Sequence, residues 1–376
     1  MLRGLTRKPP PIGLDIGADV VRLLQVDALG GAVSATAAAF RTLPPAAIGD
    51  PPVRREHVVT AIRDMLASGA FRGRRVVTCL GDGTLRVKQA RLPRLNDAER
   101  DSAILWEASE RFDFDVKPEL LHHLVAGDVR SANEIQQEVI LLGAAEDTVE
   151  AHVAMLSQVG LYPVAVDAEP ICAFRAFERF LRRDCDTEVV SVLVDIRGAN
   201  TWVLFARGRR IGFIKSVDVG THHFTQAIAK QLNLEYTEAV EVRRHQGTLS
   251  MSENPEQIRQ AVRDALRPVA EELAREINLC LRYCAVTFRG SRPDRVTLVG
   301  EAAADAHVRE LICESINLDC ETGRPFKGID SSQVALGSDQ RGPLCEWSVA
   351  TGLALRELII KDTGQEDGDE PDRLSA

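Results

Sequence analysis

The 376-residue sequence has no uninterrupted apolar run of about 18 residues, so we expect no helix that spans a membrane. It also lacks an excess of positive charge: 46 Lys and Arg stand against 55 Asp and Glu, a net charge of −9. That balance argues against non-specific binding to nucleic acid or to anionic lipid. The start of the chain, Met1-Leu-Arg-Gly, carries no apolar stretch typical of a signal peptide.

The eight cysteines include no Cys-x-x-Cys pair. Cys280 and Cys284 lie four residues apart in a helical pattern without a partnering histidine, so we expect reduced, buried thiols and no metal site. Hydrophobic residues make up 45% and charged residues 27% of the chain, which is typical of a globular protein long enough for about two to three cores.

Two similar stretches stand out within this composition. The first runs from Ile12 through Asp15, Gly17 and Asp19, and the second from Val192 through Asp195. Each is an apolar run that ends in Asp, followed by a glycine turn and a second apolar run, which predicts a β-hairpin with a carboxylate at the end of its first strand. Two copies indicate a duplicated architecture. Such turns can bring N–H groups close to an anion, and Asp can hold a divalent metal through water. The alternative is that both acids only accept N–H bonds within their turns.

The pattern of the first half predicts three strands, a proline-rich loop that includes Pro51 and Pro52, a helix over 56–68 and a strand over 75–80. An α+β insertion and a helix over 171–182 follow. Within the insertion we expect an edge strand over 112–116. The second half repeats the hairpin and third strand. A long apolar face follows over 255–289, where Pro268 predicts a kink or break. Further helices are predicted over 308–315 and 346–358.

We expect five parts: a first half (12–87 and 165–188), the insertion (88–164), a second half (189–222 and 293–360), its subdomain (223–292) and an acidic, disordered tail (361–376).

The order of these motifs resembles the actin-like ATPases, which also include sugar kinases, and among them the PilM family of type IV pilus assembly. The resemblance covers roughly residues 12 to 360. It rests on two phosphate-loop motifs, on segments at the entry and exit of an inserted subdomain, on adenosine-side segments, and on a closing helix. The phosphate-loop motifs are 12–17 and 194–198, and the entry and exit segments are 103–108, 141–145 and 164–170. The adenosine-side segments are 226–229, 238–239, 243 and 296–301, and the closing helix is 350–355.

The resemblance implies two βββαβα halves around a cleft, with ATP and Mg²⁺ between them. Asp15 and Asp195 would hold hydrated Mg²⁺, and Glu169 matches the acid that positions water in hydrolysing relatives. Alternatively, Glu169 before Pro170 only favours a helix N-terminus. The residues implied to contact the nucleotide are Asp15, Gly17, Ala18, Asp195, Arg197, Gly198, Thr201, Gly220, Glu238, Arg243, Gly300 and Glu301.

Three positions depart from the family pattern. Asp19 replaces a hydroxyl residue, Arg197 replaces a glycine, and Glu301 stands in the adenosine turn. A carboxylate about 4 Å from a phosphate oxygen repels it by roughly 4 kcal/mol at an effective dielectric near 20. Arg197 could offset this by pairing with phosphate, or the two acids could point away. We therefore expect at most a weak ATPase.

The resemblance also implies a partner, the N-terminal cytoplasmic peptide of a PilN-like inner-membrane protein, docked between the core and the insertion. The segment 106–125 would line that groove, with Trp106, Phe112 and Phe114 as partner-binding residues. Alternatively, the two phenylalanines are core residues. The expected role is a cytoplasmic scaffold, peripheral to the inner membrane through its partner, with neither nucleic-acid binding nor direct membrane insertion; self-association is left open.

Two other functions use the same fold. One is an active ATPase or small-molecule kinase, which needs intact glycine turns and a substrate-facing base. The other is an FtsA-like filament former, which needs a basic amphipathic anchor at its C-terminus, whereas this tail is acidic. A type II secretion counterpart of PilM would have the same sequence features.

Overall fold

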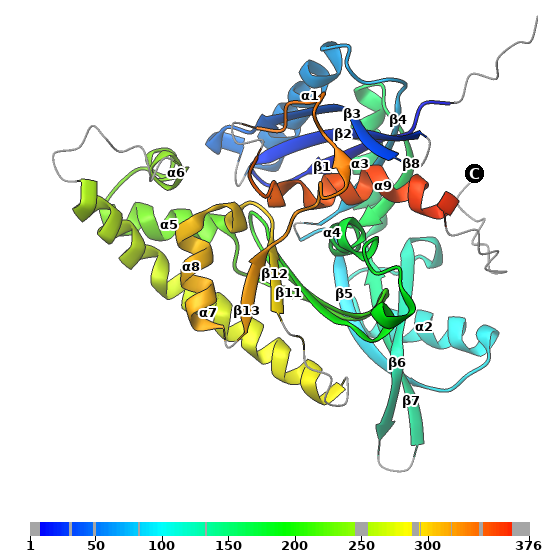
Figure 1. The fold of residues 1–376 in the computed structure, drawn as a ribbon. Helices are drawn as coiled ribbons and strands as arrows, with labels where there is room; N and C mark the ends of the chain where they lie inside the picture. Colours follow the sequence, from blue (N-terminus) through cyan, green and yellow to red (C-terminus); the bar gives the residue numbers. More distant parts are fainter. Residues whose placement is uncertain are drawn as a thin grey trace, which may run out of the picture.

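The computed structural model describes most of the chain (Figure 1). The described residues are 8–29, 32–47, 50–81, 83–131, 134–244, 255–287, 293, 295–316, 318–337 and 341–362. The expected disordered tail lies outside them, apart from its first two residues. No described helix is both long and apolar enough to cross a membrane.

The first sheet has the strand order β14-β3-β2-β1-β4-β8. Strands β1, β2 and β3 form an antiparallel meander. Strands β4 and β8 add in parallel beside β1, and β14 pairs in parallel with β3. The strands are β1 (Ile12–Ile16), β2 (Val20–Leu29), β3 (Ala32–Thr42), β4 (Arg75–Leu80), β8 (Tyr162–Ala168) and β14 (Ile329–Asp330).

The second sheet repeats this plan in the order β11-β10-β9-β12-β13. Its strands are β9 (Val190–Ile196), β10 (Thr201–Arg207), β11 (Arg210–Val217), β12 (Arg295–Val299) and β13 (Asp319–Thr322). The registers of the two hairpins also agree, because Asp15 pairs with Arg22 and Asp195 pairs with Trp202, each seven residues later. The predicted duplication is therefore present strand by strand.

Two helices fill the space between the sheets, α4 (Glu169–Glu178) and α9 (Ser348–Asp362) (Figure 1). They approach closely because Gly352 of α9 lies on the backbone of Cys172, where an added Cβ would overlap the carbonyl oxygen. On the other side of α9, a Cβ at Gly13 of β1 would lie 2.8 Å from the carbonyl oxygen of Ala350. Glycines on both sides thus set the depth at which α9 packs.

Helix α1 (Pro51–Ala67) starts earlier than the predicted residue 56. The prediction placed Pro51 and Pro52 in a loop and is wrong, because both prolines occupy the first turn, where the missing N–H groups have no helical partner. Asp50 caps this end by accepting a hydrogen bond from Val53 N at 3.1 Å.

The second half carries α5 (Thr221–Leu232), α6 (Tyr236–Arg244), α7 (Pro255–Thr287) and α8 (Ala306–Ser315). Helix α7 is continuous through Pro268, so of the predicted kink or break the break is wrong, and the kink stays a prediction. Leu266, Leu273 and Ile277 of its apolar face are fully buried. That burial offsets the loss of one helical hydrogen bond.

The insertion forms a three-stranded sheet in the order β5-β7-β6, with α2 (Asp97–Arg111) packed on it. Its strands are β5 (Arg86–Pro93), β6 (Leu121–Ser131) and β7 (Glu134–Gly143). The chain returns through α3 (Glu146–Gln158) to β8 of the first sheet. Short 3₁₀ turns complete the described elements: η1 (Pro45–Ala47), η2 (Pro118–Leu120), η3 (Asp184–Glu188), η4 (Ala302–Ala304) and η5 (Cys345–Trp347).

The predicted edge strand over 112–116 is wrong. Phe112 ends α2 by donating its N–H to Ala108 O. The Phe112 and Phe114 rings then stack with centroids 5.2 Å apart and lie against Gly143. This packing draws the segment toward the end of β7 and away from ladder pairing at a sheet edge.

His152 of α3 makes the free energy of unfolding depend on pH. Its Nε2 lies 3.1 Å from Thr78 Oγ1, and burial lowers the pKa of His152 from 6.5 to about 4. In the unfolded chain His152 therefore binds a proton below pH 6.5, whereas in the native state it binds one only below about pH 4. As pH falls through this window, we expect the parent protein to lose up to about 3 kcal/mol of its free energy of unfolding through His152. The His152→Gln variant should not show this loss in urea titrations. Parallel pH profiles of the two proteins would contradict the assignment.

Candidate functional site

The first hairpin places Asp15 at the end of β1, fully buried. Its turn is closed by a hydrogen bond from Gly17 N to Val20 O at 3.0 Å. Arg54 of α1 holds the turn from behind, donating to Gly17 O at 2.8 Å and to Ala18 O.

The second hairpin places Asp195 at the corresponding point of β9, 1% exposed. Arg197 N donates to Asn200 O at 2.9 Å, which closes this turn. Thr201 begins the return strand and donates its hydroxyl to Val219 O at 2.6 Å. Gly220 begins α5 close to the carbonyl oxygens of Arg197 and Gly198, where a Cβ would lie 2.5 Å from each.

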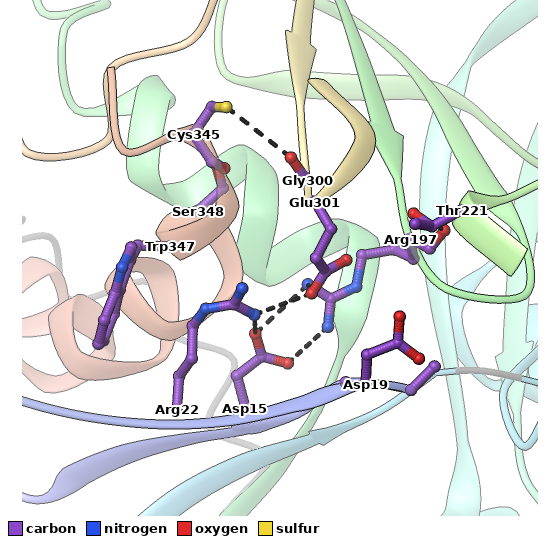
Figure 2. Close-up of polar contacts among 12 residues, drawn as sticks. Asp15, Asp19, Arg22, Arg197, Thr221, Gly300, Glu301, Cys345, Trp347 and Ser348 are labelled. Carbon is purple, nitrogen blue, oxygen red and sulfur yellow. Dashed lines mark hydrogen bonds and ion pairs between the residues drawn. The ribbon is translucent and has the colours of Figure 1, made fainter. Parts of the chain in front are cut away.

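Arg197 lies at the centre of the site (Figure 2) and is 1% exposed. Its guanidinium donates to both oxygens of Asp15, with Nη2–Oδ1 at 2.6 Å and Nη1–Oδ2 at 3.3 Å. Nη2 also lies 3.0 Å from Glu169 Oε1, and Nη1 lies 3.7 Å from Glu301 Oε1. One buried cation therefore contacts acids from β1, from α4 and from the turn after β12.

Glu301 follows Gly300, whose φ of +88° favours glycine. Glu301 Oε1 accepts a hydrogen bond from Arg22 Nη1 at 2.8 Å (Figure 2). The same arginine nitrogen lies 3.7 Å from Asp15 Oδ2. Burial alone would raise the pKa of Glu301, but Arg197 and Arg22 beside it hold that pKa at about 2. Glu301 is thus an ionised member of the network.

Asp195 differs from the other acids. Neither of its oxygens has a hydrogen-bond partner within the described part of the chain. Burial raises the pKa of Asp195 to about 7 in spite of the opposing attraction of Arg197. An isolated buried carboxylate is unfavourable as an anion, so this side chain is half protonated near neutral pH.

Glu169, the predicted catalytic acid, is 2% exposed at the start of α4. Its Oε2 accepts a hydrogen bond from Trp202 Nε1 at 2.7 Å, and its Oε1 lies against Arg197. Gly81 leaves the space for this carboxylate, because a Cβ there would overlap it. Both oxygens of Glu169 are therefore engaged by the second half of the protein.

The two turns also meet directly. A Cβ at Gly198 would overlap Ala18 Cβ, so the loops are in van der Waals contact. Beside them, His222 Nε2 of α5 lies 2.6 Å from Asp19 Oδ1. Asp19, which departs from the family pattern, therefore bonds to the opposite half.

Two predicted nucleotide-contacting residues have other partners. Glu238 Oε2 accepts a hydrogen bond from Glu235 N at 3.0 Å at the start of α6. Arg243 Nε donates to Thr225 Oγ1 at 3.1 Å between α6 and α5. Sequence reasoning missed Arg22, Trp202 and His222 as members of the site. The hairpin register offered a signal for Arg22 and Trp202, since each lies opposite an Asp on the neighbouring strand.

The residues present do not fit Mg²⁺ and ATP in this arrangement. Both Asp15 oxygens contact arginine nitrogens, where a hydrated metal would need them free. At Gly17 a Cβ would lie 3.2 Å from Arg197 Nη2 and from Glu301 Oε1, so side chains fill the space in front of the first phosphate loop. Among the described residues of the site, the carboxylate oxygens without a hydrogen-bond partner are those of Asp195 and Glu301 Oε2. Partial protonation of Asp195 removes charge that a cation would otherwise balance.

The three predicted partner-binding residues differ in exposure. Trp106 on α2 is 62% exposed, whereas Phe112 is 7% exposed and belongs to the core of the insertion. Phe114 is partly buried against it. The burial supports the alternative in which the phenylalanines are core residues, and it leaves Trp106 as the accessible aromatic side chain of the three.

Two sheets of the same strand order, with acid-tipped hairpins facing each other over one site, define the actin-like class of proteins. A family model described as type IV pilus assembly protein PilM matches residues 13–358. The chain therefore belongs to the PilM family.

Solved structures agree with this fold. In a "PilM-PilN type IV pilus biogenesis complex" the similar chain is 24% identical with a TM-score of 0.74, covering 93% of this chain and 99% of that one. The ethanolamine utilization protein EutJ from Carboxydothermus hydrogenoformans is 15% identical with a TM-score of 0.54, covering 93% and 90%.

Proposed function

We propose that the chain is a cytoplasmic scaffold of the inner-membrane platform that assembles a type IV pilus or a related type II secretion system. Its partner would be the N-terminal cytoplasmic peptide of a PilN-like membrane protein, which would keep the scaffold peripheral to the membrane. The observation that carries this proposal is the family match over residues 13–358, and the similarity to a PilM chain solved with PilN supports it.

The proposed docking site includes the α2 face of the insertion. Trp106 exposes 62% of its surface there, although a large aromatic side chain normally gains by burial. Exposed aromatic residues of this kind act as anchors for peptides in protein interfaces. The Phe112–Phe114 stack lies beneath, where it supports the subdomain.

We expect Trp106→Ala to weaken binding of the PilN-like peptide at least about tenfold, because the substitution removes the exposed aromatic anchor. Titration of a fluorescently labelled peptide measures the change. Phe40→Ala is the matched control: Phe40 is an aromatic side chain 38% exposed on β3, which β2 and β1 separate from β4 and β8, and its loss should leave the affinity unchanged. Equal affinities of the Trp106 variant and the parent would exclude this face.

The second candidate function is an active ATPase or small-molecule kinase of the same fold. It needs a free metal ligand and a free catalytic acid, whereas Asp15 and Glu169 are both bound by Arg197. Phosphate release from Mg–ATP, with and without the peptide, separates the two candidates. Peptide binding without turnover supports the scaffold, and steady turnover supports the enzyme.

A further inference from the structure

Arg197 places a positive charge among the acids of the site. It lies within 3.7 Å of carboxylate oxygens from Asp15, Glu169 and Glu301, and only 1% of it is exposed. A charge this deeply buried is tolerated only when it is paired and hydrogen-bonded, and the same holds for the acids around it. Arg197 and Arg22 are thus the two cations that the chain itself places among the carboxylates of Asp15, Glu169 and Glu301.

The contacts of this network cross the cleft. Asp15, Arg22 and Glu169 belong to the first half, whereas Arg197 and Glu301 belong to the second. The hydrogen bond from Trp202 to Glu169, the contact of Asp19 with His222 and the packing of Gly198 on Ala18 join the same two halves.

We propose that Arg197 is a built-in counter-ion, which together with Arg22 offsets the negative charge of the site in place of a bound metal ion and keeps the two halves closed without a nucleotide. The inference goes beyond the scaffold function, because it concerns what holds the site together. It follows from the misfit between these residues and Mg–ATP. The closed arrangement is then the resting state of the protein, and Mg–ATP is not its ligand.

The first test uses the wild-type protein. Thermal unfolding with and without millimolar Mg–ATP should give the same midpoint, and calorimetry should detect no binding heat, because a ligand of the native state raises the midpoint. A clear rise of the midpoint together with saturable heat would overturn the inference.

The second test compares Arg197→Lys with Arg197→Met. Both side chains are unbranched and of similar length, but only lysine keeps the positive charge. We expect the lysine variant to stay near the wild-type midpoint and the methionine variant to fall by about 5 °C or more, because Asp15 and Glu169 lose their closest buried cation while Arg22 stays beside Glu301.

A methionine variant that fails to fold while the lysine variant folds supports the inference. Equal stability of the two variants would overturn it, since packing and not charge would then account for Arg197. If neither variant folds, the wild-type titration decides. Peptide binding enters neither test, so a failure here leaves the scaffold function standing.

Discussion

Gly352→Ala is expected to destabilise the protein by more than about 3 kcal/mol or to prevent its folding. Its new Cβ would overlap the carbonyl oxygen of Cys172, and both groups belong to rigid helix backbones. Helix α9 cannot move away, since its other side rests on β1 at Gly13. The clash can be relieved only by separating α4 from α9, the two helices between the sheets.

Chemical denaturation of the purified variant measures this loss. Thr351→Ala is the control, because Thr351 is fully buried on the same helix and its Oγ1 has no hydrogen-bond partner among the described residues. Removing its atoms should cost only about 1 kcal/mol. A Gly352 variant as stable as the control would show that the α4–α9 contact tolerates an extra atom.

This helix contact marks a limit of sequence reasoning. The apolar pattern of residues 346–358 predicted a helix, and α9 forms over Ser348–Asp362. The pattern did not indicate that Gly352 packs against another helix backbone. That contact depends on α4, whose Cys172 lies 180 residues earlier in the sequence. Periodicity reports which face is buried and not what covers it.

The duplicated strand order was predictable because each hairpin has a local signature of apolar runs, an acid and a turn. The local errors came from proline and from aromatic packing. Pro51 and Pro52 were assigned to a loop although they start α1, and Pro268 lies inside a continuous α7. In both cases tertiary burial or position within the helix outweighed the general preference of the residue.

The candidate site was predictable in position but not in chemistry. Asp15, Asp195 and Glu169 could be placed near one another by resemblance, and Arg197 could be marked as a departure. The sequence left open whether Arg197 would meet a phosphate or point elsewhere. In the structure Arg197 pairs with carboxylates of the site, Asp15 among them. This pairing depends on how close the two hairpins lie in space, and they are about 180 residues apart in sequence.

Asp195→Asn is expected to stabilise the protein at alkaline pH, although it removes an acid that the family resemblance assigns to Mg²⁺. The physical reason is that Asp195 is buried without a hydrogen-bond partner among the described residues, and its pKa is raised from 3.8 to about 7. Asparagine has the same shape and no charge to bury.

The sign of the pH dependence follows from these two pKa values. Between pH 3.8 and about 7 the native state keeps a proton on Asp195 that the unfolded chain has lost. Wild-type stability therefore falls as pH rises through this window, by up to about 1.4 kcal/mol per pH unit. Glu301, with a pKa of about 2, contributes only to the acid side of the profile.

Urea titrations of wild type and Asp195→Asn from pH 4 to pH 8 measure the difference. We expect near equality at pH 4 and a gain for the variant on the order of 3 kcal/mol at pH 8. The matched control is Asp15→Asn on the mirrored hairpin, where the acid is bound by Arg197. That variant should lose stability, by about 3 kcal/mol or more, because it leaves Arg197 short of a buried counter-charge. A loss of stability at pH 8 in both variants would mean that Asp195 is ionised and engaged, and the two hairpins would then be chemically equivalent as well as topologically so.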